Sequence, residues 1–243
     1  MTGTTALIYD DAYLSYQFGP DHPLQPTRVK YTLDLIKEFK LLNGKARLYS
    51  PKAASEEDLR SVHSPEYVNT VKRMSAVGRG FLDSGDTPAT KGIFEAACSV
   101  VGGSILGADL IMKGEVRHAF NPGGGHHHAK RDGASGFSVF NDIAIAVRRL
   151  QRRYGVRRVA IIDIDGHHAD GTQEIFYKVC NPKCGKVFLT REYFGISEVK
   201  FDFHEFHFFN FHFAISQFRP PKMHLLILLS CTQHLFLWLS PWP

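Results

Sequence analysis

The 243-residue sequence is poor in cysteine and lacks the motifs of several common enzyme classes. Its four cysteines are too few for a disulfide scaffold, so the fold must depend on side-chain packing. The sequence contains no G-x-S-x-G motif and no P-loop, which leaves serine-hydrolase and phosphate-binding functions without support. The N-terminus lacks the basic and apolar regions of a secretory signal, so we expect a cytoplasmic protein, or a nuclear one if the source is a eukaryote.

The composition changes near residue 177. Apolar residues make up 44% of the chain and charged residues 22%, which excludes an intrinsically disordered protein and favours a globular domain. Residues 178–243, however, hold eleven of the 19 phenylalanines and only two of the 21 glycines. They also carry +3 of the net charge of +5, so the main segment has only +2 and we expect no nucleic-acid partner. We therefore divide the chain into segments 1–177 and 178–243.

Short apolar runs alternate with helical patterns in the first segment. The sequence predicts strands at 6–9, 46–49, 116–120 and 159–163, and helices at 28–39, 55–62, 90–112 and 141–154. Thr27, Ser55 and Asn141 are residue types that cap helix N-termini. Continuous apolar strands between helices are typical of a parallel sheet covered on both faces. We therefore predict a three-layer α/β domain with a central parallel sheet.

A cluster of glycines and histidines follows the third predicted strand. Gly123, Gly124 and Gly125 precede three consecutive histidines at 126–128. Glycine allows the backbone to approach a ligand closely. Neighbouring histidines there can supply two ring nitrogens to one reacting centre. The alternative is a flexible surface loop or an adventitious metal-binding run.

An acidic cluster follows the fourth predicted strand. On an extended backbone Asp163, Asp165 and His167 point the same way, at the strand end where parallel sheets bind ligands. Carboxylate and imidazole suit a catalytic zinc or ferrous ion, with a third protein ligand to complete the site. An ordinary Asp-Gly turn is the alternative, but it does not account for three aspartates and two histidines within eight residues. The two clusters together predict a metal-assisted hydrolase with a histidine as general base and then general acid.

These clusters resemble motifs of the zinc-dependent histone deacetylase family, which includes acetoin-utilisation-type and acetylpolyamine deacetylases and has an arginase-like α/β fold. The resemblance covers roughly residues 6–177. In the family's order, the matching motifs are His22-Pro23 with Arg28, His63-Ser64-Pro65-Glu66-Tyr67-Val68, Asp86-Thr87-Pro88-Ala89-Thr90, Gly124-Gly125-His126-His127-His128-Ala129, Gly136-Phe137 with Phe140-Asn141-Asp142, and Asp163-x-Asp165-x-His167-His168-x-Asp170-Gly171-Thr172.

The resemblance implies a deacetylase that acts on an acetylated lysine peptide or protein, or on an acetylpolyamine. His127 and His128 would handle protons at a water bound to zinc, with iron as the alternative metal. A structural potassium ion would lie near Asp163. The implied carboxylate partners of the histidines are Asp163 and Asp170, and two of the three implied metal ligands are Asp165 and His167.

The resemblance also implies a narrow channel for the acyl-lysine side chain. Phe137, beside Gly136, would form one wall of this channel. Asp86 would hold the substrate backbone at the rim, and Arg28 would lie near the inner end.

The family's third metal ligand, an aspartate, and its electrophilic tyrosine have no match after residue 177. Residues 200–243 resemble the translation of an intron or a shifted frame, so we expect a truncated or replaced C-terminal part. The alternatives to an active deacetylase are a degenerate domain that binds acyl-lysine or a protein partner without turnover, and a chain that does not fold stably. The apolar run 225–239 is shorter than the ~20 residues of a spanning helix, so we expect no membrane span, with a tail anchor as the alternative.

Overall fold

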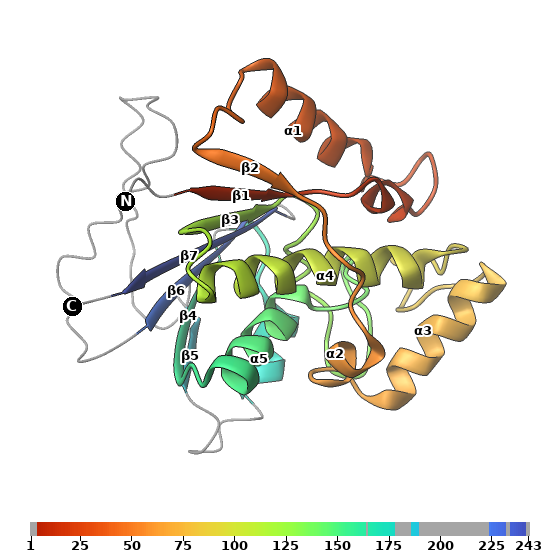
Figure 1. Ribbon diagram of the computed structural model, residues 1–243. Coiled ribbons are helices and arrows are strands. Elements are labelled where there is room, and N and C mark those ends of the chain that lie inside the picture. Colours follow the sequence, from red (N-terminus) through yellow and green to blue (C-terminus); the bar gives the residue numbers. More distant parts are fainter. Residues whose placement is uncertain (1–3, 164, 178–185, 190–223, 232–233, 242–243) are drawn as a thin grey trace.

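In the computed structural model, seven strands form one sheet with helices packed against it (Figure 1). The structure describes residues 4–163, 165–177, 186–189, 224–231 and 234–241. The strands are β1 (Thr5–Ile8), β2 (Ala46–Tyr49), β3 (His118–Asn121), β4 (Arg158–Asp163), β5 (Lys186–Leu189), β6 (His224–Cys231) and β7 (His234–Pro241). The helices are the 3-10 helix η1 (Asp11–Ser15) and the α-helices α1 (Thr27–Glu38), α2 (Glu56–Arg60), α3 (Pro65–Val77), α4 (Ile93–Met112), α5 (Asp142–Tyr154) and α6 (Asp170–Tyr177).

The sheet has the strand order β2-β1-β3-β7-β6-β4-β5. Its described pairs are parallel except those of β7, which runs antiparallel to β3 and to β6. β6 and β7 lie two residues apart in the sequence, and so short a connection joins only antiparallel strands. The predicted α/β class is therefore confirmed, and the sheet is parallel apart from this one strand.

The apolar run 225–239 forms parts of β6 and β7 instead of a single helix. These two strands lie between β3 and β4 in the sheet. Because β3 and β4 run in the same direction, the loops that follow them leave from the same edge. This edge is where the two sequence clusters meet.

Local signals explain where several helices begin. The Ser55 side chain accepts a hydrogen bond from the Asp58 backbone N–H, and the Asp58 carboxylate accepts one from the Ser55 backbone N–H. The Asn141 side chain accepts one from Ala144 at the start of α5, so these two predicted caps are confirmed. The predicted cap at Thr27 is wrong, because α1 already includes Thr27 and no side chain caps its N-terminus. The sequence did not predict α3, although Ser64 caps it and Gly78 ends it with a left-handed φ of 71°.

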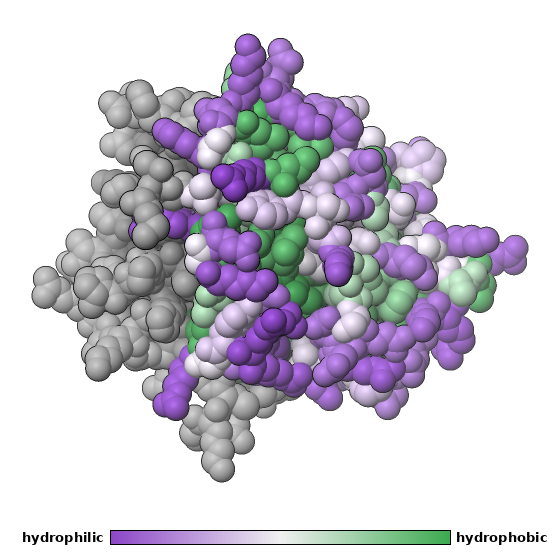
Figure 2. Space-filling model, viewed as in Figure 1, coloured by the Kyte–Doolittle hydropathy of each residue, from purple (hydrophilic) through white to green (hydrophobic). Residues whose placement is uncertain are grey.

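The glycine- and alanine-rich helix α4 lies in the hydrophobic core and packs on β1 and β3. Figure 2 shows hydrophobic residues in the middle of the molecular face over α4, with hydrophilic residues over α5. Among the described helices, α4 alone is long and apolar enough to cross a membrane, but 72% of the relevant window is buried inside the protein. Buried core helices commonly have this composition.

Candidate active site

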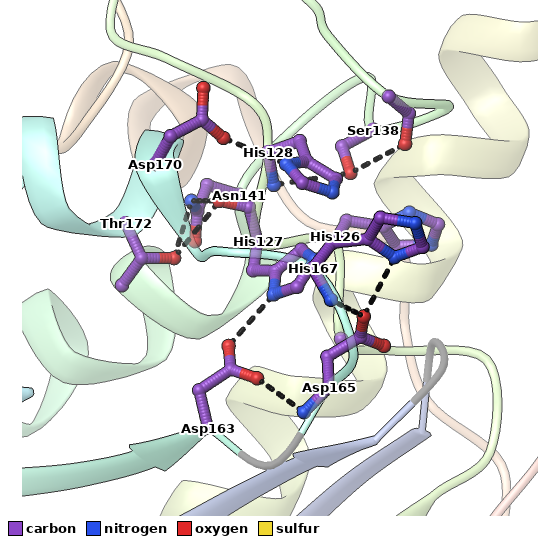
Figure 3. Close-up of polar contacts among 12 residues, drawn as sticks. His126, His127, His128, Ser138, Asn141, Asp163, Asp165, His167, Asp170 and Thr172 are labelled. Carbon is purple, nitrogen blue, oxygen red and sulfur yellow. Dashed lines mark hydrogen bonds and ion pairs between the residues drawn. The ribbon is translucent and has the colours of Figure 1, made fainter. Parts of the chain in front are cut away.

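The candidate active site lies at the edge of the sheet where the chain leaves β3 and β4 (Figure 3). The loop after β3 carries His127 and His128, and Asp163 ends β4. Asp165 and His167 follow in the loop that leads to α6. Residues about forty positions apart in the sequence thus meet because their strands are parallel.

His127 forms a buried pair with Asp163. The ring Nδ1 lies 2.7 Å from Asp163 Oδ2, and the two side chains are only 6% and 8% exposed. Burial lowers the pKa of His127, but the hydrogen bond to Asp163 and the neighbouring carboxylates outweigh it, so the pKa is raised overall. The other carboxylate oxygen of Asp163 accepts the backbone N–H of Asp165 at 3.0 Å. Asp163 therefore both orients the imidazole and shapes the loop after β4.

His128 forms a second pair, with Asp170 at the start of α6. Its Nδ1 lies 2.7 Å from Asp170 Oδ1, and the Lys130 ammonium lies 3.2 Å from Oδ2. Partial burial raises the pKa of Asp170, but the His128 hydrogen bond and Lys130 lower it by more. The centroids of the His127 and His128 rings are 4.1 Å apart, and the rings meet edge to face. Each of the two adjacent histidines thus has a carboxylate of its own.

Residues at the start of α5 and in α6 hold the backbone of this histidine loop through hydrogen bonds. The Asn141 amide donates to the Ala129 carbonyl and to the Thr172 hydroxyl, both at 3.0 Å. The Thr172 backbone N–H donates to the His127 carbonyl at 2.9 Å. A side chain at Gly171 would lie 2.4 Å from the His128 carbonyl group, so only glycine allows α6 to pack this closely.

His126, the first histidine of the run, has different surroundings from this pair. It is only 2% exposed, stacks on Tyr16 with ring centroids 4.6 Å apart, and has its Nε2 3.1 Å from the Gly123 carbonyl. Burial lowers the pKa of His126 to about 3, so it stays neutral. His126 therefore packs in the interior and takes no part in the two carboxylate pairs.

Asp165 and His167 bring two metal-binding atoms together. His167 Nδ1 and Asp165 Oδ1 are 3.0 Å apart, and the Asp165 side chain is 4% exposed whereas that of His167 is 79% exposed (Figure 3). Carboxylate and imidazole are suitable ligands for zinc or iron. Within the described parts of the chain, no group of three His, Cys, Asp or Glu residues is arranged to hold a metal. These two residues thus fit two positions of a three-ligand site.

Three of the four residues predicted to bind substrate, Asp86, Gly136 and Phe137, lie together in loops next to His128. A side chain at Gly136 would lie 2.5 Å from the His128 ring, so this loop packs directly on the imidazole. Phe137 is half-buried and follows at once, and its backbone N–H donates to the Thr87 hydroxyl next to Asp86. Asp86 itself is exposed. The structure therefore brings the predicted rim and wall together beside the histidine pair.

Arg28 lies in the first turn of α1, close enough to the buried residues Tyr16 and His126 to interact with them electrostatically. Burial lowers the pKa of its guanidinium to about 10, although the nearby Tyr16 opposes this. Sequence reasoning did not single out Tyr16, whose hydroxyl donates to the Phe137 carbonyl. A lone tyrosine in a loop gives no sequence signal for such a contact.

Comparison with known proteins identifies the family. A family model described as histone deacetylase domain matches residues 22–209. The chain belongs to the histone deacetylase family. Acetoin utilization protein AcuC of Bacillus subtilis (strain 168) is 40% identical over 180 residues, which are 71% of this chain and 46% of AcuC. AcuC of Staphylococcus aureus (strain MSSA476) is 37% identical over the same shares of the two chains.

A solved structure of this histone deacetylase family has the same fold. The crystal structure of the HDA15 HD domain is 28% identical, with a TM-score of 0.67 over 77% of this chain and 53% of that chain. The chain spans about half the length of the curated relatives it matches. The resemblance and the fold expected from the sequence are thus confirmed, whereas the roles of individual site residues stay predictions.

Proposed function

We propose that this chain is a metal-dependent deacetylase that hydrolyses N-acetyl-lysine in histones or other proteins, or related acetyl-amides such as acetylpolyamines. The observation that carries the proposal is the pair of adjacent histidines, each with its own carboxylate at 2.7 Å, beside the two metal-binding side chains. Membership of the histone deacetylase family supports the same reaction. Localisation in the cytoplasm or nucleus, the potassium ion near Asp163 and the lack of a nucleic-acid partner stay predictions.

Asp165 and His167 would hold the metal, zinc or alternatively iron, as two of its protein ligands. A bound metal of this kind acidifies a water molecule and polarises a carbonyl. The Nδ1 atom of each catalytic imidazole is occupied by its carboxylate, so proton transfer at His127 and His128 must use Nε2. One ring can then accept a proton from the attacking water while the other donates one to the leaving amine.

Substrate would enter along Phe137. In this proposal its ring and the Gly136 backbone contact the lysine methylenes, and Asp86 accepts hydrogen bonds from the peptide at the rim. Desolvated apolar walls of this kind recognise a lysine only after its charge has been removed by acylation. This gives a physical reason for selectivity toward acyl-lysine over lysine.

One specific observation favours a second candidate, a degenerate domain that binds acyl-lysine or a partner protein without turnover. The described residues lack a third metal ligand near Asp165 and His167, and the sequence shows no counterpart of the family's electrophilic tyrosine. Loss of one donor to an oxyanion typically lowers the rate about 10²–10³-fold. The sequence of the C-terminal segment offers Asp202, His204 and His207 as possible replacements for the missing third ligand, and all three lie outside the described residues.

Four measurements on the full chain distinguish these functions from each other and from a chain that does not fold. The chain is supplied with zinc, its metal content is determined by elemental analysis, and an acetyl-lysine peptide is tested for both binding and acetate release. The deacetylase proposal predicts near-stoichiometric zinc and acetate release. Peptide binding with neither zinc nor acetate release would support the degenerate domain instead. Cleavage throughout the chain by limited proteolysis would show that it does not fold stably.

A further inference from the structure

Phe137 has an unusual backbone conformation. Its φ is 66°, in the left-handed region that bulky side chains rarely adopt. The preceding Gly136 is also left-handed, with φ 51°. A strained residue of this kind persists only where surrounding contacts hold it, and such residues gather at functional sites. The contacts on both sides of Phe137 are therefore informative.

Two buried hydroxyl groups form hydrogen bonds with the backbone of Phe137, one with its N–H and the other with its carbonyl. The Phe137 N–H donates to Thr87 Oγ1 at 3.1 Å, and the Tyr16 hydroxyl donates to the Phe137 carbonyl at 2.8 Å. Tyr16 in turn accepts the Val139 N–H at 3.0 Å. Thr87 is fully buried and Tyr16 is 4% exposed, so water does not readily replace these bonds.

Thr87 belongs to the same tight loop as the rim residue Asp86. Asp83 Oδ1 accepts the backbone N–H groups of Gly85, Asp86 and Thr87 at 2.9 to 3.1 Å, which fixes the path of this loop. The Thr87 hydroxyl donates within the loop, to the Asp83 carboxylate, and so presents its lone pair to Phe137. The Thr87 hydroxyl therefore joins the rim loop to the loop of Phe137, and a backbone hydrogen bond from Gly136 to the Asp86 carboxylate adds a second link.

Further contacts position the aromatic ring of Phe137. The His22 ring meets the Phe137 ring edge to face, with centroids 4.5 Å apart. His22 Nε2 also lies 3.1 Å from the Asp86 carbonyl, so His22 contacts both the rim and the wall. A side chain at Gly136 would lie 2.5 Å from the His128 ring, so the preceding residue also packs closely on this imidazole.

We infer that Tyr16 and Thr87 are positioning residues, which hold Phe137 in its left-handed conformation and so fix the substrate-facing wall next to His128. This inference rests on the proposed function for the part that concerns substrate. It predicts that removing either hydroxyl lets the Phe137 peptide relax and weakens recognition of the acyl-lysine side chain. Neither substitution removes His127 or His128, the residues proposed to transfer protons.

Amide hydrogen exchange on the full chain tests the contact itself, without any need for activity. Thr87→Val should speed exchange at Phe137, and Tyr16→Phe should speed exchange at Val139, each about fivefold, the effect of losing one net hydrogen bond. Thr87→Ser keeps the hydroxyl and should restore protection. The two variants act from opposite loops, so failure of one to fold leaves the other to decide. Unchanged exchange at both amides would overturn the inference.

Steady-state kinetics with an acetyl-lysine peptide tests the substrate role. Tyr16→Phe and Thr87→Val should raise KM more than they lower kcat, and Thr87→Ser should behave like the unmodified chain. Tyr154→Phe is a matched control, because it removes a tyrosine hydroxyl bond to Asp109 in the α4–α5 region. Equal KM values for all variants would contradict the positioning role. A wild-type chain that neither binds nor hydrolyses the peptide would overturn the proposed function and the substrate role. Hydrogen exchange would still decide whether Tyr16 and Thr87 hold Phe137 in place.

Discussion

At the residue scale, the two imidazole–carboxylate pairs have the same length but different surroundings. Both Nδ1–Oδ distances are 2.7 Å, yet the side chains of His127 and Asp163 are 6% and 8% exposed, against 20% and 38% for His128 and Asp170. A hydrogen bond to an ionised group is stronger when water is excluded. The buried pair should therefore depend more on its carboxylate than the outer pair does.

Substitution of each carboxylate tests this difference. We expect Asp163→Asn to lower the rate of acetate release about 10- to 100-fold, the usual effect of losing a carboxylate behind a metal-site histidine. Asp170→Asn should have a smaller effect, because solvent can replace part of its interaction. Asp132→Asn is the control, since this exposed residue lies outside the site. An equal loss in both site variants would contradict the ranking by burial.

His63 is held neutral mainly by its burial. Its Nδ1 lies 2.9 Å from the Lys130 carbonyl and donates to it, while Nε2 accepts the Asn141 N–H at 3.0 Å. A proton on Nε2 would face another donor, and burial lowers the pKa of His63 to about 4. In the unfolded chain a histidine titrates near pH ~6.5.

This pKa difference predicts acid sensitivity. Between about pH 6.5 and pH 4 the unfolded state binds a proton at His63 that the native state does not, so the free energy of unfolding falls as the pH falls. The loss approaches ~3 kcal/mol at the lower limit, at ~1.4 kcal/mol per pH unit. Urea unfolding across this range checks the slope, and His63→Gln should make it shallower by about one proton. An unchanged slope in that variant would contradict the assignment.

The sequence placed the candidate chemical residues in short local motifs, and the structure brings those motifs together. His127, His128, Asp163, Asp165 and Asp170 all lie in two runs of adjacent residues. Residues that support the site from a distance were harder to find. The contact of Tyr16 with Phe137, for example, spans 121 residues and depends on the fold.

At the element scale, α5 links the fold to the histidine loop through its first turn. Asn141 caps the helix with its side-chain oxygen and holds the Ala129 carbonyl with its side-chain amide.

Two variants of Asn141 separate these two contributions. Asn141→Ala should lose the cap, worth about 1 kcal/mol, and the loop contact. Asn141→Ser should recover the cap and the stability that goes with it, but not the rate of acetate release. Recovery of both by serine would show that the loop contact is unimportant.

Chemical markers at the boundaries led to correct predictions for some elements, although α3, which has Ser64 and Gly78 at its ends, was missed. Ser55 and Asn141 were identified as caps because their side chains suit that position. The apolar run 225–239 gave no such marker, and its division into β6 and β7 depends on pairing with β3 and β4, which are far away in the sequence. Strand pairing between distant segments cannot be predicted from local pattern alone.

At the scale of the whole molecule, the two halves of the site are joined through β7 and β6. β3 and β4 carry the histidine loop and the acidic cluster, and the strands between them belong to the segment 178–243. Composition and motifs set this segment apart from 1–177, and that division stays a prediction. The strand order suggests that the sheet around the site nonetheless depends on the segment.

Truncation tests this dependence. We expect a chain that ends at residue 222, just before β6, to lose its cooperative unfolding transition, because β3 and β4 would then have no strands between them. Circular dichroism during thermal unfolding measures this change. An intact transition in the truncated chain would show that 1–177 folds without β6 and β7 and would support the division at residue 177.

The central claim is that His127 and His128 carry out proton transfer for amide hydrolysis in this chain. Its most direct test is acetate release from an acetyl-lysine peptide by the zinc-supplied full chain, compared with the double variant His127→Asn/His128→Asn at matched folding. We predict measurable release by the wild-type chain and a loss of at least about 10²-fold in the variant, the usual contribution of positioned acid–base groups. Equal release by the two proteins, or none by either, would contradict the claim.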